Sequence, residues 1–278
     1  VVAWGGEDAD PPAYGKVYVA IKPTSGTVLS QSSKKYVQDE ILKKRNIVGI
    51  TPEVVDPDYM YLKVNSTVKY DSGTTTNSAS QLKATVTTAV TDFGETNLKT
   101  FDKSFRYSKL IQAIDAAEIS VKSNQTSLQL KRYLYPLLGS SEAYVLPFSN
   151  QVFHPSNNFW GSVTSGEFSY RDSANTLWDS CRLQDANGVV EVYRTSGEDR
   201  IIVNNNVGTI TYLTGKMELS SFEPIIINSE TTGNTTPLEV FITPASSDVN
   251  PLREQIILIE SDDVTITMLD DAGTGTYV

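Results

Sequence analysis

The sequence has little with which to hold a metal or to carry out redox chemistry. Among its 278 residues it contains one cysteine, Cys181, and one histidine, His154. A single cysteine excludes a disulfide or a thiolate metal cage within one chain, and a single histidine excludes a histidine-rich zinc site. We therefore expect no metal and no cofactor, and the cysteine count suits assembly in a reducing cytoplasm.

Long apolar runs and a basic charge balance are missing as well. No run approaches the roughly 20 consecutive apolar residues that a membrane helix requires. A hydrophobic content of 39% is typical of a soluble globular protein. The net charge is −10, whereas binding to phosphates requires a cationic face. Neither a membrane nor a nucleic acid is an expected partner.

Catalytic motifs are also absent. His154 is the one conventional general base, and neither a Gly-X-Ser-X-Gly sequence nor a phosphate-binding glycine loop accompanies it. Glu7, Asp8 and Asp10 offer carboxylates, but the spaced ligands, turn glycine and terminal glutamate of a calcium loop are lacking. We predict no catalytic residues and no enzymatic activity. A pair of carboxylates that are distant in the chain but meet in the fold, as in glycosidases, stays open.

Residues 16–138 carry alternating strand and helix patterns. Strands are expected at 17–21, 49–55, 59–70, 118–122 and 127–134, and helices at 34–44, 79–93 and 107–116. In the first helix the residues at helical spacing, which we expect to face inward, are Tyr36, Val37, Ile41 and Leu42. Gly94 is expected to end the second helix as a left-handed cap. The element order is typical of a split-βαβ, or ferredoxin-like, layer.

Residues 139–278 show a different pattern, in which short strands alternate with turn residues. The clearest signal is Asn187-Gly188 between two alternating runs, which predicts a tight hairpin. Many strands at short intervals indicate an antiparallel sandwich or open barrel. The predicted fold is therefore α+β, with an extended acidic and proline-containing arm at 1–15, an α+β domain at 16–138, and a mainly β domain at 139–278 that ends in a loose tail.

Two segments are candidates for protein contacts. The stretch WGGEDADPP, residues 4–12, cannot form a helix or an inner strand, because glycines add backbone freedom and prolines lack amide donors. It is too acidic for a core, so we expect it to lie on a neighbouring surface. The second segment is an aromatic loop, since exposed aromatic side chains often anchor contacts. The predicted interface residues are Trp4, Glu7, Asp8 and Asp10 in the arm, and Phe153, Phe159 and Trp160 in the loop.

The opening of the chain also resembles a known family. GGEDADPP followed by GKVYVAIKP is similar to the signature of the baseplate wedge subunit of T-even-type contractile-tailed phages, which is related to the baseplate J-like proteins of other contractile injection machines. A later run, GTITY with GKMEL, resembles a hairpin of the J-like proteins. The resemblance extends over the chain, which we expect to be the C-terminal portion of a longer subunit.

The resemblance implies a structural role in the virion. Wedge subunits of this family self-associate, so a dimer within a larger ring around the baseplate hub is implied, together with contacts to other wedge proteins. Assembly in the host cytoplasm and rearrangement on sheath contraction are implied as well. One alternative is a carbohydrate-binding or carbohydrate-cleaving module of a tail fibre or spike, because tyrosines and tryptophans among short strands suit sugar stacking. A second alternative, a hydrolase, is weakened by the single histidine.

Overall fold

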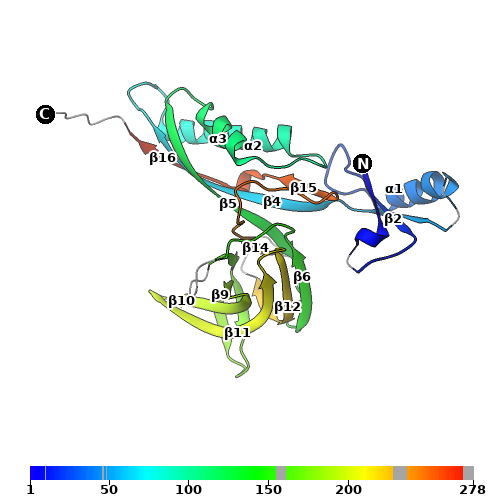
Figure 1. The fold of residues 1–278 in the computed structure, drawn as a ribbon. Coiled ribbons are helices and arrows are strands. Elements are labelled where there is room, and N and C mark those ends of the chain that lie inside the picture. The colour runs from blue at the N-terminus through cyan, green and yellow to red at the C-terminus, as the bar shows by residue number, and fades with distance from the viewer. Residues whose placement is uncertain (10, 46, 48, 155–160, 228–236, 272–278) are drawn as a thin grey trace.

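The computed structural model describes residues 1–9, 11–45, 47, 49–154, 161–227 and 237–271. Within these ranges the chain forms a three-stranded sheet near the N-terminus and a thirteen-stranded sheet that contains the remaining strands (Figure 1). The fold is α+β, as predicted. No helix in the described ranges combines the length and apolar character needed to cross a membrane.

The small sheet has the order β1-β2-β3, with β1 at Val2–Gly5, β2 at Lys16–Ala20 and β3 at Thr51–Val55. β1 is antiparallel to β2, whereas β3 is parallel to it. A parallel pair requires a crossover connection. The helical segment α1 (Gln31–Tyr36), η2 (Val37–Leu42) and η3 (Lys43–Arg45) lies in this connection.

The large sheet begins with two long antiparallel strands, β4 (Asp58–Tyr70) and β5 (Val121–Leu134). Between them the chain forms α2 (Ala79–Asn97) and α3 (Tyr107–Asp115), which lie together along one face of this layer in Figure 1. Ser78 and Gln81 form a capping box at the start of α2, which satisfies backbone amides that a helix start leaves unpaired. The buried residues of the two helices are apolar at helical spacing: Leu82, Val86 and Val90 in α2, and Leu110 and Ile114 in α3.

Gly94 does not end α2, and that prediction is wrong. The helix continues to Asn97, and Gly94 is buried inside it. A Cβ atom at Gly94 would lie 3.0 Å from the Cβ atom of Ile259. The missing side chain therefore permits close packing of the helix against the C-terminal part of the chain.

The single split-βαβ layer is not confirmed, because the strands that it requires lie in different sheets. β2 and β3 pair with each other in the small sheet, while β4 and β5 pair in the large one. The second edge of β4 is occupied by β15 (Gln255–Leu258) and β16 (Val264–Asp270). Three apolar side chains of these two strands are almost fully buried, namely Ile256, Ile257 and Ile266. Burial of this apolar surface favours β15 and β16 over β2 as neighbours of β4.

The second half of the chain is rich in antiparallel strands, as predicted. Its strands are β6 (Glu142–Pro147), β7 (Val163–Ser165), β8 (Phe168–Arg171), β9 (Leu177–Ala186), β10 (Val189–Ser196), β11 (Asp199–Thr211), β12 (Lys216–Phe222), β13 (Pro224–Ile227) and β14 (Leu238–Ile242). The hairpin at Asn187-Gly188 is confirmed: Ala186 pairs with Val189, and both turn residues have positive φ. Phe168 and Phe222 pack edge to face in the core, with ring centroids 5.2 Å apart.

The chain then returns to its first half. β14 pairs with both β5 and β7, and β15 and β16 run parallel to β4. Leu258 pairs with Tyr61, and Val264 pairs with Val64. Between these two pairs, the segment that joins β15 to β16 has three more residues than β4 has. This bulge contains the short helix η4 (Ser261–Asp263). The division at residue 138 stays a prediction, while these pairings join strands of both halves in one sheet.

Candidate functional site

The predicted arm contains a strand at the edge of the small sheet. Trp4 lies in β1 and pairs with Tyr18 of β2. Their rings lie 5.7 Å apart at an interplanar angle of 33°. Strand β1 has a neighbour on one side, in accordance with the expectation that this segment is not an inner strand. Trp4 is thereby held on a fixed strand with its ring half-buried.

After β1 the chain forms a closed loop. Gly6–Asp8 make a short 3-10 turn, and the carbonyl oxygen of Gly6 accepts hydrogen bonds from the amides of Ala9 and Ala13 at 3.2 and 2.7 Å. Gly6 is buried, and a Cβ atom there would lie 2.0 Å from the carbonyl oxygen of Ala13. The loop can therefore close in this way only around a residue without a side chain.

Gly6→Ala is expected to lower the free energy of unfolding by about 1–3 kcal/mol, the range for overpacking a tight site. Urea unfolding followed by circular dichroism measures the change. Gly166→Ala is the matched control, because the nearest atom to a Cβ at Gly166 is 3.8 Å away. Equal stability of the two variants would contradict the tight closure of the loop at Gly6.

A groove separates this loop from the body of the protein, and we call it the arm groove. Its volume is about 400 Å³. One wall comes from the N-terminal unit and the other from the ends of segments in the large sheet. The lining residues are Trp4, Asp8, Ala9, Tyr18 and Val55 on the first side, and Asp58, Pro147, Ser149, Leu252, Glu254 and Gln255 on the second. The groove thus combines apolar walls with several carboxylates.

The large-sheet side of the groove is organised by a charged pair. The guanidinium of Arg132 binds both carboxylate oxygens of Asp58, and its Nη2 atom donates to Oδ2 at 2.7 Å. The same oxygen accepts a hydrogen bond from Nε2 of Gln255 at 2.9 Å, and that nitrogen lies 3.2 Å from Oγ of Ser149. The negative charge of Asp58 is therefore balanced inside the protein, and strands β4, β5 and β15 meet at this point.

Two further carboxylates line the groove, and their charge is not balanced in this way. Asp8 is exposed and Glu254 is half-buried. Among the described residues, no lysine or arginine lies within 4 Å of either carboxylate. The nearby Lys16 is paired with Glu53 at 2.7 Å. The groove therefore presents negative charge beside aromatic surface.

The structure brings only part of the predicted interface set together. Trp4 and Asp8 line the arm groove, whereas Glu7 is exposed on the 3-10 turn and does not line it. Phe153 is 50% exposed and lies in the β half, where its amide donates to the carbonyl oxygen of Thr243 at 2.9 Å. The remaining predicted residues, Asp10, Phe159 and Trp160, lie outside the described residues. The assignment of all seven residues to an interface stays a prediction.

A second exposed surface was missed by the sequence interpretation. The apolar stripe of the first helix was expected to face inward, yet no residue of the helical segment 31–45 is buried. Tyr36 is 62% and Ile41 39% exposed, and the nearby Ile47 is 72% exposed. The prediction of an inward-facing stripe is therefore wrong for Tyr36 and Ile41, whereas Val37 and Leu42 of the same stripe are half-buried. We call the exposed apolar residues Tyr36, Ile41 and Ile47 the helical patch.

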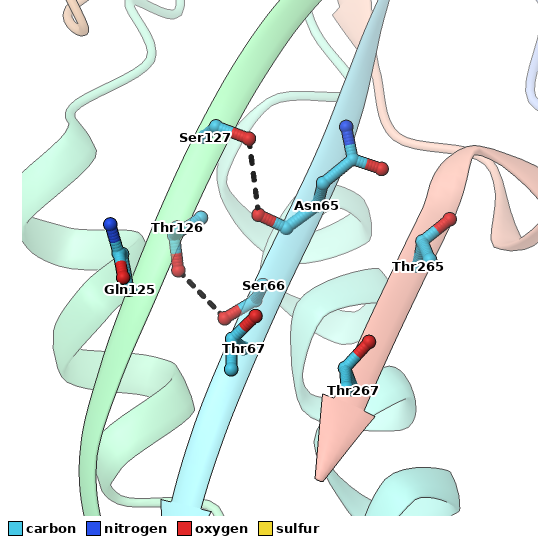
Figure 2. Close-up of a pocket in the computed structure, with 8 residues that line it drawn as sticks. All are labelled: Asn65, Ser66, Thr67, Gln125, Thr126, Ser127, Thr265 and Thr267. Carbon is cyan, nitrogen blue, oxygen red and sulfur yellow. Dashed lines mark hydrogen bonds between the residues drawn. The ribbon is translucent and has the colours of Figure 1, made fainter. Parts of the chain in front are cut away.

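A polar pocket crosses strands β4, β5 and β16, with a volume of about 370 Å³ (Figure 2). Its lining side chains carry hydroxyl or amide groups, and none is aromatic or titratable: Asn65, Ser66, Thr67, Gln125, Thr126, Ser127, Thr265 and Thr267. The hydroxyls of Ser66 and Thr126 bind each other at 2.8 Å. This pocket has neither an acid or base for catalysis nor an aromatic wall for sugar stacking.

A buried lysine is the centre of the main charged cluster. Lys131 on β5 lies 2.5 Å from Asp263 in the β15–β16 bulge, and its Nζ donates to the Tyr133 hydroxyl at 2.8 Å. Glu239 and Glu260 are 3.5 and 3.8 Å away. Burial alone would lower the pKa of Lys131, but the bonds to Asp263 and Tyr133 outweigh it and raise that pKa above its ordinary value. Lys131 is therefore charged at neutral pH and is not suited to act as a base or nucleophile.

Cys181 and His154 are the single cysteine and the single histidine of the sequence. Burial raises the pKa of the Cys181 thiol to about 11, so the reactive thiolate is scarce at neutral pH. His154 is exposed, and its ring packs edge to face on Tyr212 with centroids 4.4 Å apart.

Comparison with known families finds similarity to one class of protein, the structural components of a phage baseplate. Residues 1–55 match the family model described as baseplate structural protein gp6, C-terminal domain I. Residues 58–133 match the model for C-terminal domain III of the same protein. The first range contains the small sheet, and the second contains β4, β5 and the two helices between them.

One relative shows the same similarity at the level of sequence. The chain is 26% identical over 145 residues to baseplate wedge protein gp6 of Enterobacteria phage T4, an alignment that covers 52% of this chain. The chain spans about a fifth of the relative's length, since the alignment covers 21% of it. The predicted resemblance to the C-terminal portion of a T-even baseplate wedge subunit is confirmed.

Proposed function

We propose that the chain is a structural part of the baseplate wedge of a contractile phage tail and is therefore located in the virion. The proposal rests on one observation: the residue ranges of the two family matches agree with the bounds of two structural units of the fold. The two matches meet between residues 55 and 58, where strand β3 of the small sheet ends and β4 of the large sheet begins. A scaffold role without catalysis agrees with the charged Lys131, the buried Cys181 and the non-titratable polar pocket.

In this role the chain self-associates as a dimer within a larger ring around the hub and contacts other wedge proteins. The helical patch supports such a contact, because its three apolar side chains are exposed and a partner can cover them. The arm groove is the second contact surface. Small units joined through short connections can shift against each other while each core stays intact, which suits a ring that rearranges when the sheath contracts.

Replacing Tyr36 and Ile41 by serine is expected to weaken self-association by at least about tenfold, since burial of each apolar side chain contributes roughly 1.5–3 kcal/mol. Sedimentation equilibrium over a wide concentration range measures the association constant. Leu213→Ser is the control, because Leu213 is 74% exposed, more than Tyr36 or Ile41, but lies in the β half. A wild-type chain that stays monomeric, or association unchanged in the double variant, would overturn the self-association proposal at this surface.

A further inference from the structure

We infer that the arm groove receives the side chain of an arginine or lysine presented by another protein chain. The inference deepens the proposed contact role of the arm and rests on it. Its first basis is the shape of the site. The groove has a volume of about 400 Å³, and its walls include the half-buried rings of Trp4 and Tyr18 together with Leu252 and Pro147. Such walls fit the apolar stem of a long side chain, which packs against apolar surface while its head remains polar.

The aromatic wall favours a cationic head group. The Trp4 and Tyr18 rings lie side by side on adjacent strands, 5.7 Å apart. A guanidinium or ammonium group over the face of a tryptophan or tyrosine is attracted by the negative face of the ring. The Nζ atom of Lys16 already lies 5.9 Å from the centroid of the Tyr18 ring, so the Trp4 ring is the surface on which an arginine can stack.

The negative charge of the groove also favours a cationic side chain. Asp8 comes from the N-terminal loop and Glu254 from the segment before β15, so the two carboxylates stand on different walls. Asp58 between these walls is already bound by Arg132 and Gln255. No described cation lies within 4 Å of Asp8 or Glu254. A cation placed between the walls would therefore meet two carboxylates that the protein itself does not balance.

A metal ion fits this arrangement less well than an organic cation does. Calcium requires six to eight oxygen ligands at short distance, whereas the apolar and aromatic residues of the walls offer none. Arginine combines an extended stem with a planar head that both stacks and binds carboxylates. Because the two walls belong to different structural units, an arginine bound there would also fix the small sheet against the large one.

The test is a titration followed by the indole NMR signals of a chain labelled at tryptophan with ¹⁵N. The probe is N-acetyl-arginine-methylamide, and the control ligand is the citrulline analogue, which has the same shape without charge. The Trp4 signal is assigned from its loss in Trp4→Phe. We expect a saturable shift of this signal with arginine, and binding at least about tenfold weaker with citrulline, since loss of a cation–π contact and an ion pair costs more than 1.4 kcal/mol.

The matched variant is Asp8→Asn with Glu254→Gln, which keeps the size of both side chains. It is expected to bind the arginine probe at least about tenfold more weakly. Should the double variant fail to fold, the exposed Asp8→Asn alone serves, with a smaller loss. A Trp4 signal unmoved by arginine, or moved equally by citrulline, would overturn the inference. If arginine does not bind but the chain still self-associates, only the inference about the groove is wrong. If the chain is monomeric but still binds arginine, only the proposed self-association is wrong.

Discussion

Asp263→Ala is expected to lower the free energy of unfolding by about 3–5 kcal/mol, the range for leaving a buried charge without its partner. The side chains of Lys131 and Asp263 are only 2% and 6% exposed, and their charged atoms are 2.5 Å apart. Glu239 and Glu260 lie farther from Lys131, at 3.5 and 3.8 Å, and their side chains are 42% and 46% exposed. They cannot fully replace Asp263. Urea unfolding followed by circular dichroism measures the loss.

A second variant separates the effect of the charge on stability from the effect of packing. Lys131→Met in combination with Asp263→Ala removes both charges, and it is expected to regain most of the lost stability, because apolar replacements of buried ion pairs are often neutral. If the double variant is as unstable as Asp263→Ala alone, the loss comes from packing, and the interpretation of a stranded charge is wrong.

The second large effect is expected at the arm groove, where Asp58→Ala should lower the free energy of unfolding by about 3 kcal/mol. The substitution leaves the buried guanidinium of Arg132 without its counter-ion and also removes the acceptor for Gln255. We place the effect at the lower end of the range because the Asp58 side chain is 35% exposed and its pair is partly screened by water. Urea unfolding again gives the change in free energy.

Asp58→Asn is the control for this effect, because it keeps the shape and one acceptor oxygen while removing the charge. It is expected to be intermediate between wild type and Asp58→Ala. Arg132→Met combined with Asp58→Ala should recover stability, since no charge is then left buried. A loss that is the same in Asp58→Ala and in this double variant would contradict the proposed role of the pair.

Local features of the fold could be predicted from the sequence. The Asn187-Gly188 turn was predictable because its residues accept positive φ, and helix α2 was predictable from its apolar spacing. Strand partners were not predictable in this way. The residues of β15 show that they form a buried strand, but nothing local shows that Gln255 pairs with Asp58. The split-βαβ expectation failed on this point, since the order of elements leaves the edge of β4 undetermined.

The candidate site shows the same limit. Trp4 and Asp8 were found because an acidic, glycine- and proline-containing stretch cannot be core. The other wall of the groove, with Pro147, Leu252 and Glu254, comes from segments far along the chain. These residues have no local pattern that distinguishes them from ordinary loop residues. Only the folded chain brings the two walls together.

The helical patch shows what a periodic pattern leaves open. The spacing of Tyr36 and Ile41 correctly indicates a helix with an apolar face. Periodicity contains no information on whether the surface that covers this face belongs to the same chain. In α2 the covering surface is the sheet of its own chain, whereas Tyr36 and Ile41 of the 31–45 segment stay exposed.

The parallel pairing of β16 with β4 also sets an order of events during synthesis. Val264 pairs with Val64, and strands β5 to β15 lie between them in the chain. As the polypeptide leaves the ribosome, β4, β5 and their helices emerge long before the strands that complete the sheet. Throughout that interval, the open edge of a thirteen-residue strand offers unpaired amides and carbonyls to any neighbouring chain. Where many copies are made at once, the nascent protein is thus most exposed to wrong pairing along the edge of β4 that β15 and β16 later close.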